Sequence, residues 1–128
     1  MTPLDKLQVI TLFVDDLPAA SRFYDAVFQA PAVYQDDVSR VLQFQNLLIN
    51  LLDASQAPEL MHPLAPGLAG ARPRALLTIE VENVDQICAK LVECGVQLIN
   101  GPMDRPWGRR TASFLDPAGH AWEIAHDL

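Results

Sequence analysis

Apolar and polar positions repeat along this chain with two periods, and the same order of periods occurs twice. Apolar runs predict strands at residues 7–14 and 74–81, and each run leads into apolar positions at three- and four-residue spacing, which predict a helix. The first helical stripe comprises Leu17, Ala20, Phe23, Tyr24, Val27 and Phe28, and the second comprises Val84, Ile87, Cys88, Leu91 and Val92. The chain therefore contains an internal duplication.

Short strand-like segments follow each helical stripe. They are predicted at 32–36, 40–45 and 47–53 in the first half, and at 96–100, 109–115 and 120–126 in the second. Residues 101–106 are predicted as a loop, and Asp116-Pro117-Ala118-Gly119 is a strong turn signal. Each half therefore reads as a strand, a helix and three strands (βαβββ), which predicts an α+β fold.

Capping residues mark the ends of both predicted helices. Either Asp15 or Asp16 can cap the first helix, and Asn83 can cap the second, because their side-chain oxygens accept from free backbone N–H groups. Pro31 is expected to end the first helix, and Gly95 the second.

The segment 54–73 differs from both halves because prolines and glycines recur along it. This composition predicts a linker or a lid that contributes no core element. The chain is thus expected to be one domain, 1–128, made of two modules at about 5–53 and 74–127 that the Pro-rich linker 54–73 joins.

Composition narrows the class of partner. The 128 residues suffice for one core, and 50% hydrophobic with 20% charged residues is typical of a globular domain. A net charge of −7 argues against nucleic acid or an anionic membrane as a partner, because phosphate binding needs clustered Lys and Arg. No apolar run reaches the length of a membrane span.

The cysteines indicate the compartment. Cys88 and Cys94 fall in one predicted helix, on different faces and about 9 Å apart along its axis, so they should not pair. Residues 1–6 lack the basic start and apolar stretch of a signal peptide. Two free thiols and no export signal predict a cytoplasmic protein.

Three segments carry a resemblance to a known family. They are residues 14–24, with a Phe-Tyr pair at the end; Pro106-Trp107-Gly108-Arg109-Arg110; and 114–124, where Asp116-Pro117-Ala118-Gly119 precedes Glu123. The chain resembles the vicinal oxygen chelate superfamily, the glyoxalase, bleomycin-resistance and extradiol dioxygenase group. The resemblance implies two βαβββ modules that form a curled mixed sheet around a central cavity, with helices on the outer face, commonly in a homodimer. Because this superfamily includes several kinds of enzyme and also drug-sequestering proteins, it does not fix the function.

The resemblance also implies where metal-dependent members place their ligands. Those four inward strand positions are Val9, Asn50, Leu76 and Glu123 in this chain. A catalytic metal site needs about three suitable protein ligands, and Val or Leu has no lone pair to give. The standard metal site is therefore expected to be absent, and no cofactor is expected.

Histidines offer a different set of metal ligands. His62 lies in the Pro-rich segment, while strand alternation turns His120 and His126 away from Glu123. Surface or interface roles are expected for all three, and a non-standard metal site using His62 is the alternative.

The same alternation predicts which side chains line the cavity. Thr11, Phe13, Leu48, Leu52 and Thr78 should face inward. Trp107 should either close one side of the pocket and stack on a ligand or cover the sheet edge. One of Arg109 and Arg110 should point inward.

Two acidic residues are also expected to face the cavity. Glu123 is expected to act as a general base, as a hydrogen-bonding anchor, or as the partner of an arginine, and Glu80 shares its inward direction. Trp122 has the opposite direction and should pack in the core.

Three functional hypotheses follow. The first is a metal-free protein of the bleomycin-resistance type that binds a small organic ligand in a cavity lined by Phe13, Asn50, Thr78, Trp107 and Glu123. The alternative is a glyoxalase-like lyase or isomerase, or a dioxygenase, that uses Glu123 as its catalytic residue. A third, blander possibility is that side chains fill the cavity and the surface mediates assembly.

Overall fold

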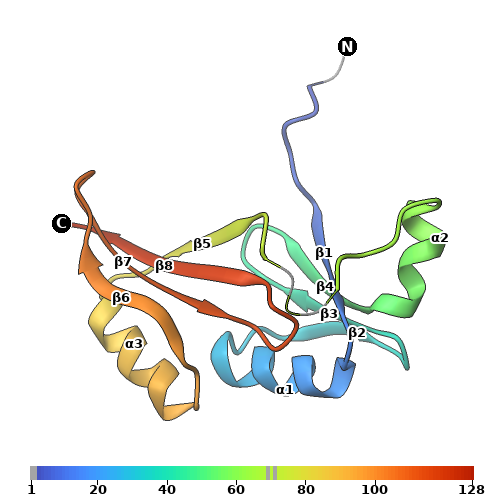
Figure 1. Cartoon of the computed structure of the whole chain (residues 1–128), viewed down its shortest axis with the longest axis horizontal. Helices are drawn as coiled ribbons and strands as arrows, with labels where there is room; N and C mark the ends of the chain where they lie inside the picture. Colours follow the sequence, from blue (N-terminus) through green and yellow to red (C-terminus); the bar gives the residue numbers. More distant parts are fainter. Residues whose placement is uncertain (1–2, 69, 71) are drawn as a thin grey trace. The chain divides into compact units, whose positions relative to one another are not determined.

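The structure is a computed structural model that describes residues 3–68, 70 and 72–128. The chain forms two compact units, 1–69 and 70–128 (Figure 1). Each unit contains a strand, a long helix and three further strands in the same order. The duplication predicted from the sequence is therefore also present in the structure.

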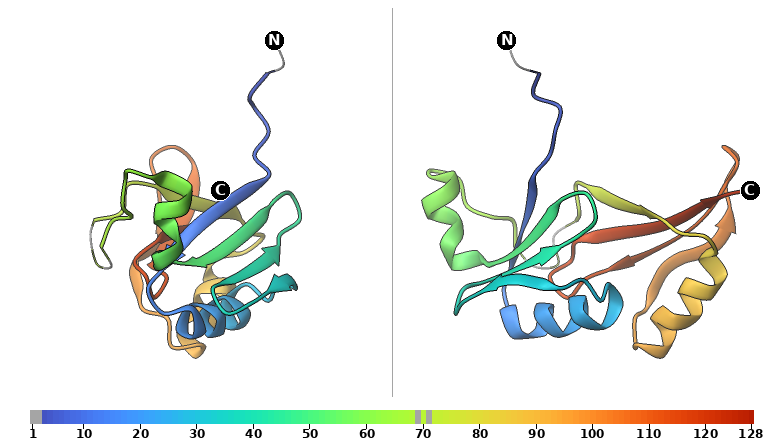
Figure 2. Two further views of the ribbon diagram at one scale, coloured as in Figure 1. Left: turned by 90° about the vertical axis from the view of Figure 1, so that its right-hand side faces the viewer. Right: turned by 180° about the vertical axis from the view of Figure 1, so that it is seen from behind.

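The first unit packs one long helix on a four-stranded sheet. Its sheet elements and main helix are β1 (Val9–Val14), α1 (Leu17–Val27), β2 (Ala32–Gln35), β3 (Ser39–Gln43) and β4 (Leu48–Asp53). The strand order is β1-β4-β3-β2, with β1 parallel to β4 and the other pairs antiparallel. Helix α1 lies across one face of this sheet (Figures 1 and 2) and shields it from water.

The second unit repeats this arrangement. Its elements are β5 (Leu76–Glu80), α3 (Val84–Glu93), β6 (Leu98–Asp104), β7 (Arg109–Leu115) and β8 (Ala121–Asp127). The strand order is β5-β8-β7-β6, again with the first strand parallel to the last and the other pairs antiparallel. Helix α3 covers one face of the sheet and contacts β6, β7 and β8 (Figure 2).

The predicted fold class is confirmed as α+β with two βαβββ modules. The expected single curled sheet is resolved into two separate four-stranded sheets that do not close. Within the described ranges, every helix is too short or too polar to cross a membrane.

Strand alternation decides which side chains of the first sheet meet α1. Leu12 and Val14 of β1 are buried, as are Ile49 and Leu51 of β4. Tyr24 of α1 is fully buried among the core residues. Each such aliphatic side chain contributes roughly 1.5–3 kcal/mol when it leaves water, so this layer stabilises the packing of α1 on the sheet.

The second core uses the equivalent positions, with larger side chains on the strands and smaller ones on the helix. Val84 and Leu91 of α3 are buried, together with Phe114 of β7 and with Trp122 and Ile124 of β8. Trp122 is thus a core residue, as its position in the strand predicts. The single residue of β8 between Trp122 and Ile124 points to the opposite face.

Side-chain caps begin both helices where the sequence predicts them. Asp16, rather than Asp15, accepts a 3.0 Å hydrogen bond from the backbone N–H of Ala19. Asn83 accepts one of 3.1 Å from Gln86. Each cap satisfies a backbone donor that the helix itself leaves unpaired.

The end of the first helix differs from the prediction. Helix α1 ends at Val27, four positions before Pro31, and Gln29 has a positive φ of 56°. The left-handed backbone at Gln29 turns the chain before the proline is reached. In the second unit, Gly95 has a φ of 82° directly after the helix, as predicted.

Residues 101–104, predicted as loop, belong to strand β6. The β6–β7 register shifts on both sides of Asn100, so a bulge accommodates the Gly-Pro pair within the strand. Gly101 has a φ of 84°, and a Cβ there would lie 2.4 Å from the carbonyl oxygen of Thr111. A glycine is therefore required where β6 presses on β7.

The predicted linker 54–73 is helical at its start. A 3₁₀ turn, η1 (Ala54–Gln56), leads directly into helix α2 (Ala57–Met61), and Ala57 is fully buried. The expectation that this segment contributes no core residue is therefore wrong at Ala57. Pro58 lies in the first turn of α2, where proline is well tolerated, so it does not prevent the helix that buries Ala57. Residues 69 and 71 of this segment lie outside the described residues.

The two cysteines are free thiols, as expected from their spacing. Cys88 is buried in α3, and Cys94 is exposed at the end of that helix. Burial raises the pKa of the Cys88 thiol, and the nearby carboxylate of Asp85 raises it further, whereas Arg110 lowers it.

Candidate functional site

Each sheet has one face packed on its long helix and another turned away from it. The face turned away from α1 in the first unit, or from α3 in the second, is called the far face below. Thr11 and Phe13 of β1 lie on the far face of the first sheet, because their neighbours Leu12 and Val14 are buried on the other side.

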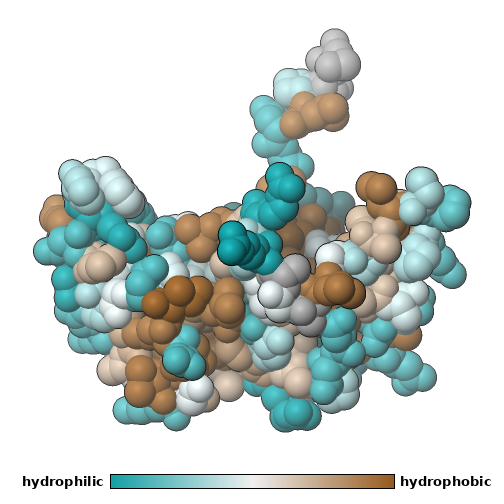
Figure 3. Space-filling view, in the orientation of Figure 1, coloured by the Kyte–Doolittle hydropathy of each residue, from teal (hydrophilic) through white to brown (hydrophobic). Residues whose placement is uncertain are grey.

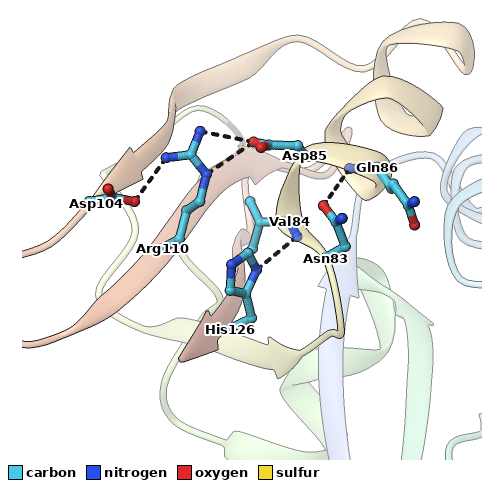
Figure 4. Close-up of polar contacts among 7 residues, drawn as sticks. All are labelled: Asn83, Val84, Asp85, Gln86, Asp104, Arg110 and His126. Atoms are coloured by element: carbon cyan, nitrogen blue, oxygen red, sulfur yellow. Dashed lines mark hydrogen bonds and ion pairs between the residues drawn. The ribbon is translucent and has the colours of Figure 1, made fainter. Parts of the chain in front are cut away.

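Polar contacts with α3 identify the two faces of the second sheet (Figure 4). Arg110 of β7 contacts Asp85 of α3 at 3.0 Å and Asp104 at 2.8 Å. These two carboxylates raise the pKa of the Arg110 guanidinium. The Nδ1 atom of His126 accepts a 2.9 Å hydrogen bond from the backbone N–H of Val84 at the start of α3.

Arg110 and His126 therefore point toward the helix. Strand alternation then places Arg109 and Glu123 on the far face. This arrangement confirms that one arginine of the pair faces the same side as Glu123, and that His126 faces away from it. The helix-facing side chains are thus engaged in packing, ion pairing and capping.

Glu123 lies in a polar row across the far face of the second sheet. Thr78 is directly opposite it on β5, and Ser113 is directly opposite it on β7. The Oγ1 hydroxyl of Thr78 donates a 2.9 Å hydrogen bond to Oε1 of Glu123. Thr78 is exposed and Glu123 is partly buried, so the carboxylate is oriented by a neighbour yet reachable from solvent.

The first unit places a related pair at the duplicated position. Thr11 of β1 lies directly opposite Asn50 of β4, as Thr78 lies opposite Glu123. The Oδ1 atom of Asn50 is buried and accepts no hydrogen bond from any described residue. An unsatisfied buried acceptor costs about 1–3 kcal/mol.

Arg109 is not the partner of Glu123. Its guanidinium contacts Asp127 at 2.8 Å and Glu80 at 3.8 Å. Among the described residues, no ion pair includes Glu123. The expected arginine partner is thus engaged elsewhere, and Glu80, the second acidic candidate, belongs to that exposed ion pair.

Trp107 lies in the turn between β6 and β7 and is 67% exposed. The guanidinium carbon of Arg105 lies 5.9 Å from the centroid of its ring. Arg105 also donates from Nε to Oγ1 of Thr111 at 2.9 Å and from Nη2 to Oδ1 of Asn100 at 3.1 Å. Trp107 therefore lies beside the cluster formed by Arg105, Thr111 and Asn100.

Sequence reasoning missed this cluster. Arg105 stands in the segment predicted as loop, where strand alternation gives no direction for its side chain. The Arg-Pro-Trp-Gly sequence, with an arginine beside an exposed aromatic residue at a hairpin turn, was the available signal.

The predicted ligand-binding residues fall into both units. Phe13 and Asn50 belong to the first, whereas Thr78, Trp107 and Glu123 belong to the second. The structure brings Thr78 and Glu123 into contact and places Trp107 against Arg105.

Two of the four positions that the resemblance implies for metal ligands do not fit a metal ion. Val9 and Leu76 are exposed strand residues whose side chains carry no donor atom. Within residues 3–68, 70 and 72–128, no three His, Cys, Asp or Glu side chains gather so that they could hold a metal ion.

Comparison with known proteins agrees with this fold. The family model for the Glyoxalase/Bleomycin resistance protein/Dioxygenase superfamily matches residues 6–124. The uncharacterized protein YraH of Bacillus subtilis (strain 168) is 32% identical over 123 residues, which cover 93% of this chain and 96% of that protein.

Solved structures extend the comparison. A glyoxalase/bleomycin resistance protein/dioxygenase from Nocardioides superposes with a TM-score of 0.88 at 20% identity and covers 100% of this chain and 87% of its own. TnmS3, an antibiotic binding protein from Streptomyces sp. CB03234, superposes with a TM-score of 0.74 at 25% identity, with 100% of both chains covered.

Proposed function

Since the chain belongs to the glyoxalase/bleomycin resistance protein/dioxygenase superfamily, we propose that it is a small-molecule-binding protein that holds an organic ligand on the far face of a sheet. The proposed contacts are Thr78, Trp107 and Glu123 in the second unit, and Phe13 and Asn50 in the first. The enclosed cavity that the family resemblance implies stays a prediction. The antibiotic-binding relative TnmS3 supports ligand binding as a function of this fold.

The Thr78–Glu123 pair is the observation that carries this proposal. The carboxylate lies on the far face, accepts one hydrogen bond from a hydroxyl, and has no basic partner among the described residues. A carboxylate in that state binds a cation or an N–H or O–H donor through a charge-assisted hydrogen bond. The buried Oδ1 of Asn50 adds a second acceptor at the duplicated position of the first unit.

The proposed binding requires no metal. Two of the four positions that metal-dependent relatives use carry Val9 and Leu76, and neither side chain can coordinate an ion. Glu123, at the fourth position, then binds the ligand directly.

A ligand screen tests the proposal. A library of amine- and amide-bearing organic molecules is screened by thermal shift, and the hits are titrated by calorimetry against wild type, Glu123→Gln and Glu93→Gln. Losing a charge-assisted hydrogen bond costs about 1.5–3 kcal/mol, so Glu123→Gln should weaken binding roughly 10- to 100-fold. Glu93→Gln removes the same charge at the end of α3 and should leave affinity unchanged. Equal affinity for all three proteins would refute the proposed role of Glu123.

A second candidate function is enzymatic, as a glyoxalase-like lyase or isomerase, or as a dioxygenase with a non-standard metal site. The observation that favours it is the same oriented carboxylate, which has the geometry of a general base that removes a proton from a bound substrate. In that case Glu123→Gln should abolish turnover while a substrate analogue still binds. Retained turnover in this variant would exclude a Glu123-centred mechanism.

Assembly and location complete the proposal. We infer a homodimer in the cytoplasm, as the family resemblance and the two free thiols support. Val92 of α3 and Ile99 of β6 are exposed apolar side chains, and hydrophobic residues gather on part of the face shown in Figure 3. Sedimentation equilibrium tests the dimer, and a monomer at all concentrations would contradict it.

A further inference from the structure

We propose that Arg105, held by Asn100 and Thr111 beside Trp107, forms an oxyanion-binding subsite on the far face of the second sheet. This inference rests on the proposed function and names its ligand class, an organic acid with a carboxylate or phosphate group. The same acid carries a hydrogen-bond donor that reaches Glu123.

The backbone at Arg105 is fixed on both sides. Its N–H donates to the carbonyl oxygen of Arg109 at 2.7 Å, and its own carbonyl oxygen accepts from Gly108 at 3.0 Å. These bonds close the turn between β6 and β7. The side chain therefore starts from a defined position rather than from a mobile loop.

Two neutral side chains then orient the guanidinium group. Nε donates to Oγ1 of Thr111, which is 1% exposed, and Nη2 donates to Oδ1 of Asn100. A guanidinium has five N–H donors in one plane, so three remain, two on Nη1 and one on Nη2, and one from each nitrogen points along the edge between them. This edge matches the two oxygens of a carboxylate or phosphate group.

The positive charge of Arg105 is not neutralised by its hydrogen-bond partners. Arg40 binds Asp25, Arg109 binds Asp127, and Arg110 binds Asp85 and Asp104, whereas both partners of Arg105 are uncharged. Among the described arginines whose side chains make hydrogen bonds, Arg105 alone has only uncharged partners. A charge that is oriented but not compensated is what an anionic ligand requires.

Trp107 supports the same reading. Its ring lies under the Arg105 guanidinium and is otherwise largely exposed, which leaves aromatic surface for a flat part of the ligand. Because Arg105 is already ordered by three neighbours, binding an anion immobilises little further side-chain freedom. The net charge of −7 repels anions at long range, but salt screens that repulsion beyond about 8 Å.

Strand register relates this subsite to Glu123. Asn100 lies opposite Ser113, and Ser113 lies opposite Glu123. Asn100 and Glu123 therefore lie in one row across the sheet, two strand spacings apart. At about 4.8 Å per spacing, the oxyanion and the donor of one ligand would be about 10 Å apart. The class of ligand is thus an elongated acid with an amine, amide or hydroxyl at its other end.

Side-chain NMR with small probes tests the subsite. Sodium benzoate and phenyl phosphate are titrated against the Arg105 Nε–H and Trp107 indole N–H resonances, with benzamide as the uncharged control. Both anions should shift these resonances and benzamide should not, and the tighter of the two shows whether a carboxylate or a phosphate is preferred. Shifts of equal size with benzamide would overturn the proposal.

Matched variants separate the subsite from general electrostatics. Arg105→Gln should weaken benzoate binding at least tenfold, and Arg105→Lys should weaken it too, because an ammonium group lacks the fork. Arg74→Gln removes the same charge from an exposed position of the second unit and should have less than a twofold effect. Equal losses in Arg105→Gln and Arg74→Gln would refute a specific site, provided that all variants keep the wild-type melting temperature.

Triglycine tests the spacing, because its amine and carboxylate are about 10 Å apart when it is extended. Its affinity should fall on carboxy-terminal amidation in wild type but not in Arg105→Gln, and on amino-terminal acetylation in wild type but not in Glu123→Gln. Benzoate binding without any effect of acetylation would keep the oxyanion subsite and refute the role of Glu123. If amidation did not weaken triglycine binding to wild type while acetylation did, the subsite would be refuted and the proposed function would stand.

Discussion

Thr78 donates a 2.9 Å hydrogen bond to Glu123, which lies directly opposite it on the neighbouring parallel strand. The duplicated pair, Thr11 and Asn50, has the same register, but the buried Oδ1 of Asn50 accepts no hydrogen bond from the described residues. One fold position thus holds a satisfied carboxylate in one unit and an unsatisfied amide oxygen in the other. This difference between the two copies can be measured.

Removing the two threonine hydroxyls should have unequal effects. Thr78→Val deletes a bond to a charged acceptor and should lower the free energy of unfolding by about 1 kcal/mol. Thr11→Val makes the same change at the duplicated position, where Asn50 Oδ1 accepts no bond, and should lower it by less than half as much. Urea denaturation of both variants and wild type decides the point, and equal losses would contradict the difference between the copies.

Replacing Asn50 by leucine should raise stability and lower ligand affinity. Asn50→Leu keeps the approximate volume and removes the buried, unsatisfied Oδ1, so the free energy of unfolding should rise by about 1 kcal/mol. Affinity for ligands found in the screen should fall, since an acceptor is lost. A destabilised Asn50→Leu protein, measured by urea denaturation, would show that the amide is satisfied in the folded state.

Divalent metals should not stabilise the protein selectively. EDTA-treated protein is melted with and without nickel, zinc, iron(II) and manganese. A specific site saturated a hundredfold above its dissociation constant adds about 2.7 kcal/mol and raises the melting temperature by several degrees. Because Val9 and Leu76 cannot coordinate an ion, we expect no selective rise. A rise with one metal alone would favour the enzymatic candidate.

Asp36 should make stability depend on pH in the acid range. Hydrogen bonds from Tyr34, Val38 and Ser39 lower the pKa of Asp36 below its ordinary value of 3.8. A pKa that is lower in the folded state stabilises the protein above the unfolded value, and this stabilisation disappears as the pH falls through the folded value.

Asp36→Asn should therefore be less stable than wild type at pH 7. Its free energy of unfolding should fall less than that of wild type as the pH drops from 5 to 2. Urea midpoints across that range measure the slope. Asp37→Asn, which removes the same charge from the adjacent position, is the control and should keep the wild-type slope. An unchanged slope in Asp36→Asn would show that the turn does not depend on this carboxylate.

The local pattern of the sequence was sufficient for much of the architecture. Helix stripes, caps at Asp16 and Asn83, and strand alternation are properties of residues close together in the chain, so they predicted the two βαβββ modules. The same alternation set Trp122 and His126 on the helix side of β8 and Glu123 on the other. The local signal was misleading at residues 101–104, where a proline and a glycine read as a loop although a bulge keeps them in β6.

What the sequence determined by itself is therefore the duplicated fold, its two cores and the face on which Glu123 lies, because these follow from periods of two and 3.6 residues. Only the tertiary structure decided which side chains meet. Thr78 and Glu123 are distant in sequence, and their contact depends on the register of β5 on β8. Arg105 reaches Asn100 and Thr111 because of the bulge between β6 and β7. Register and bulges arise from pairing between separate strands, so no local period encodes them.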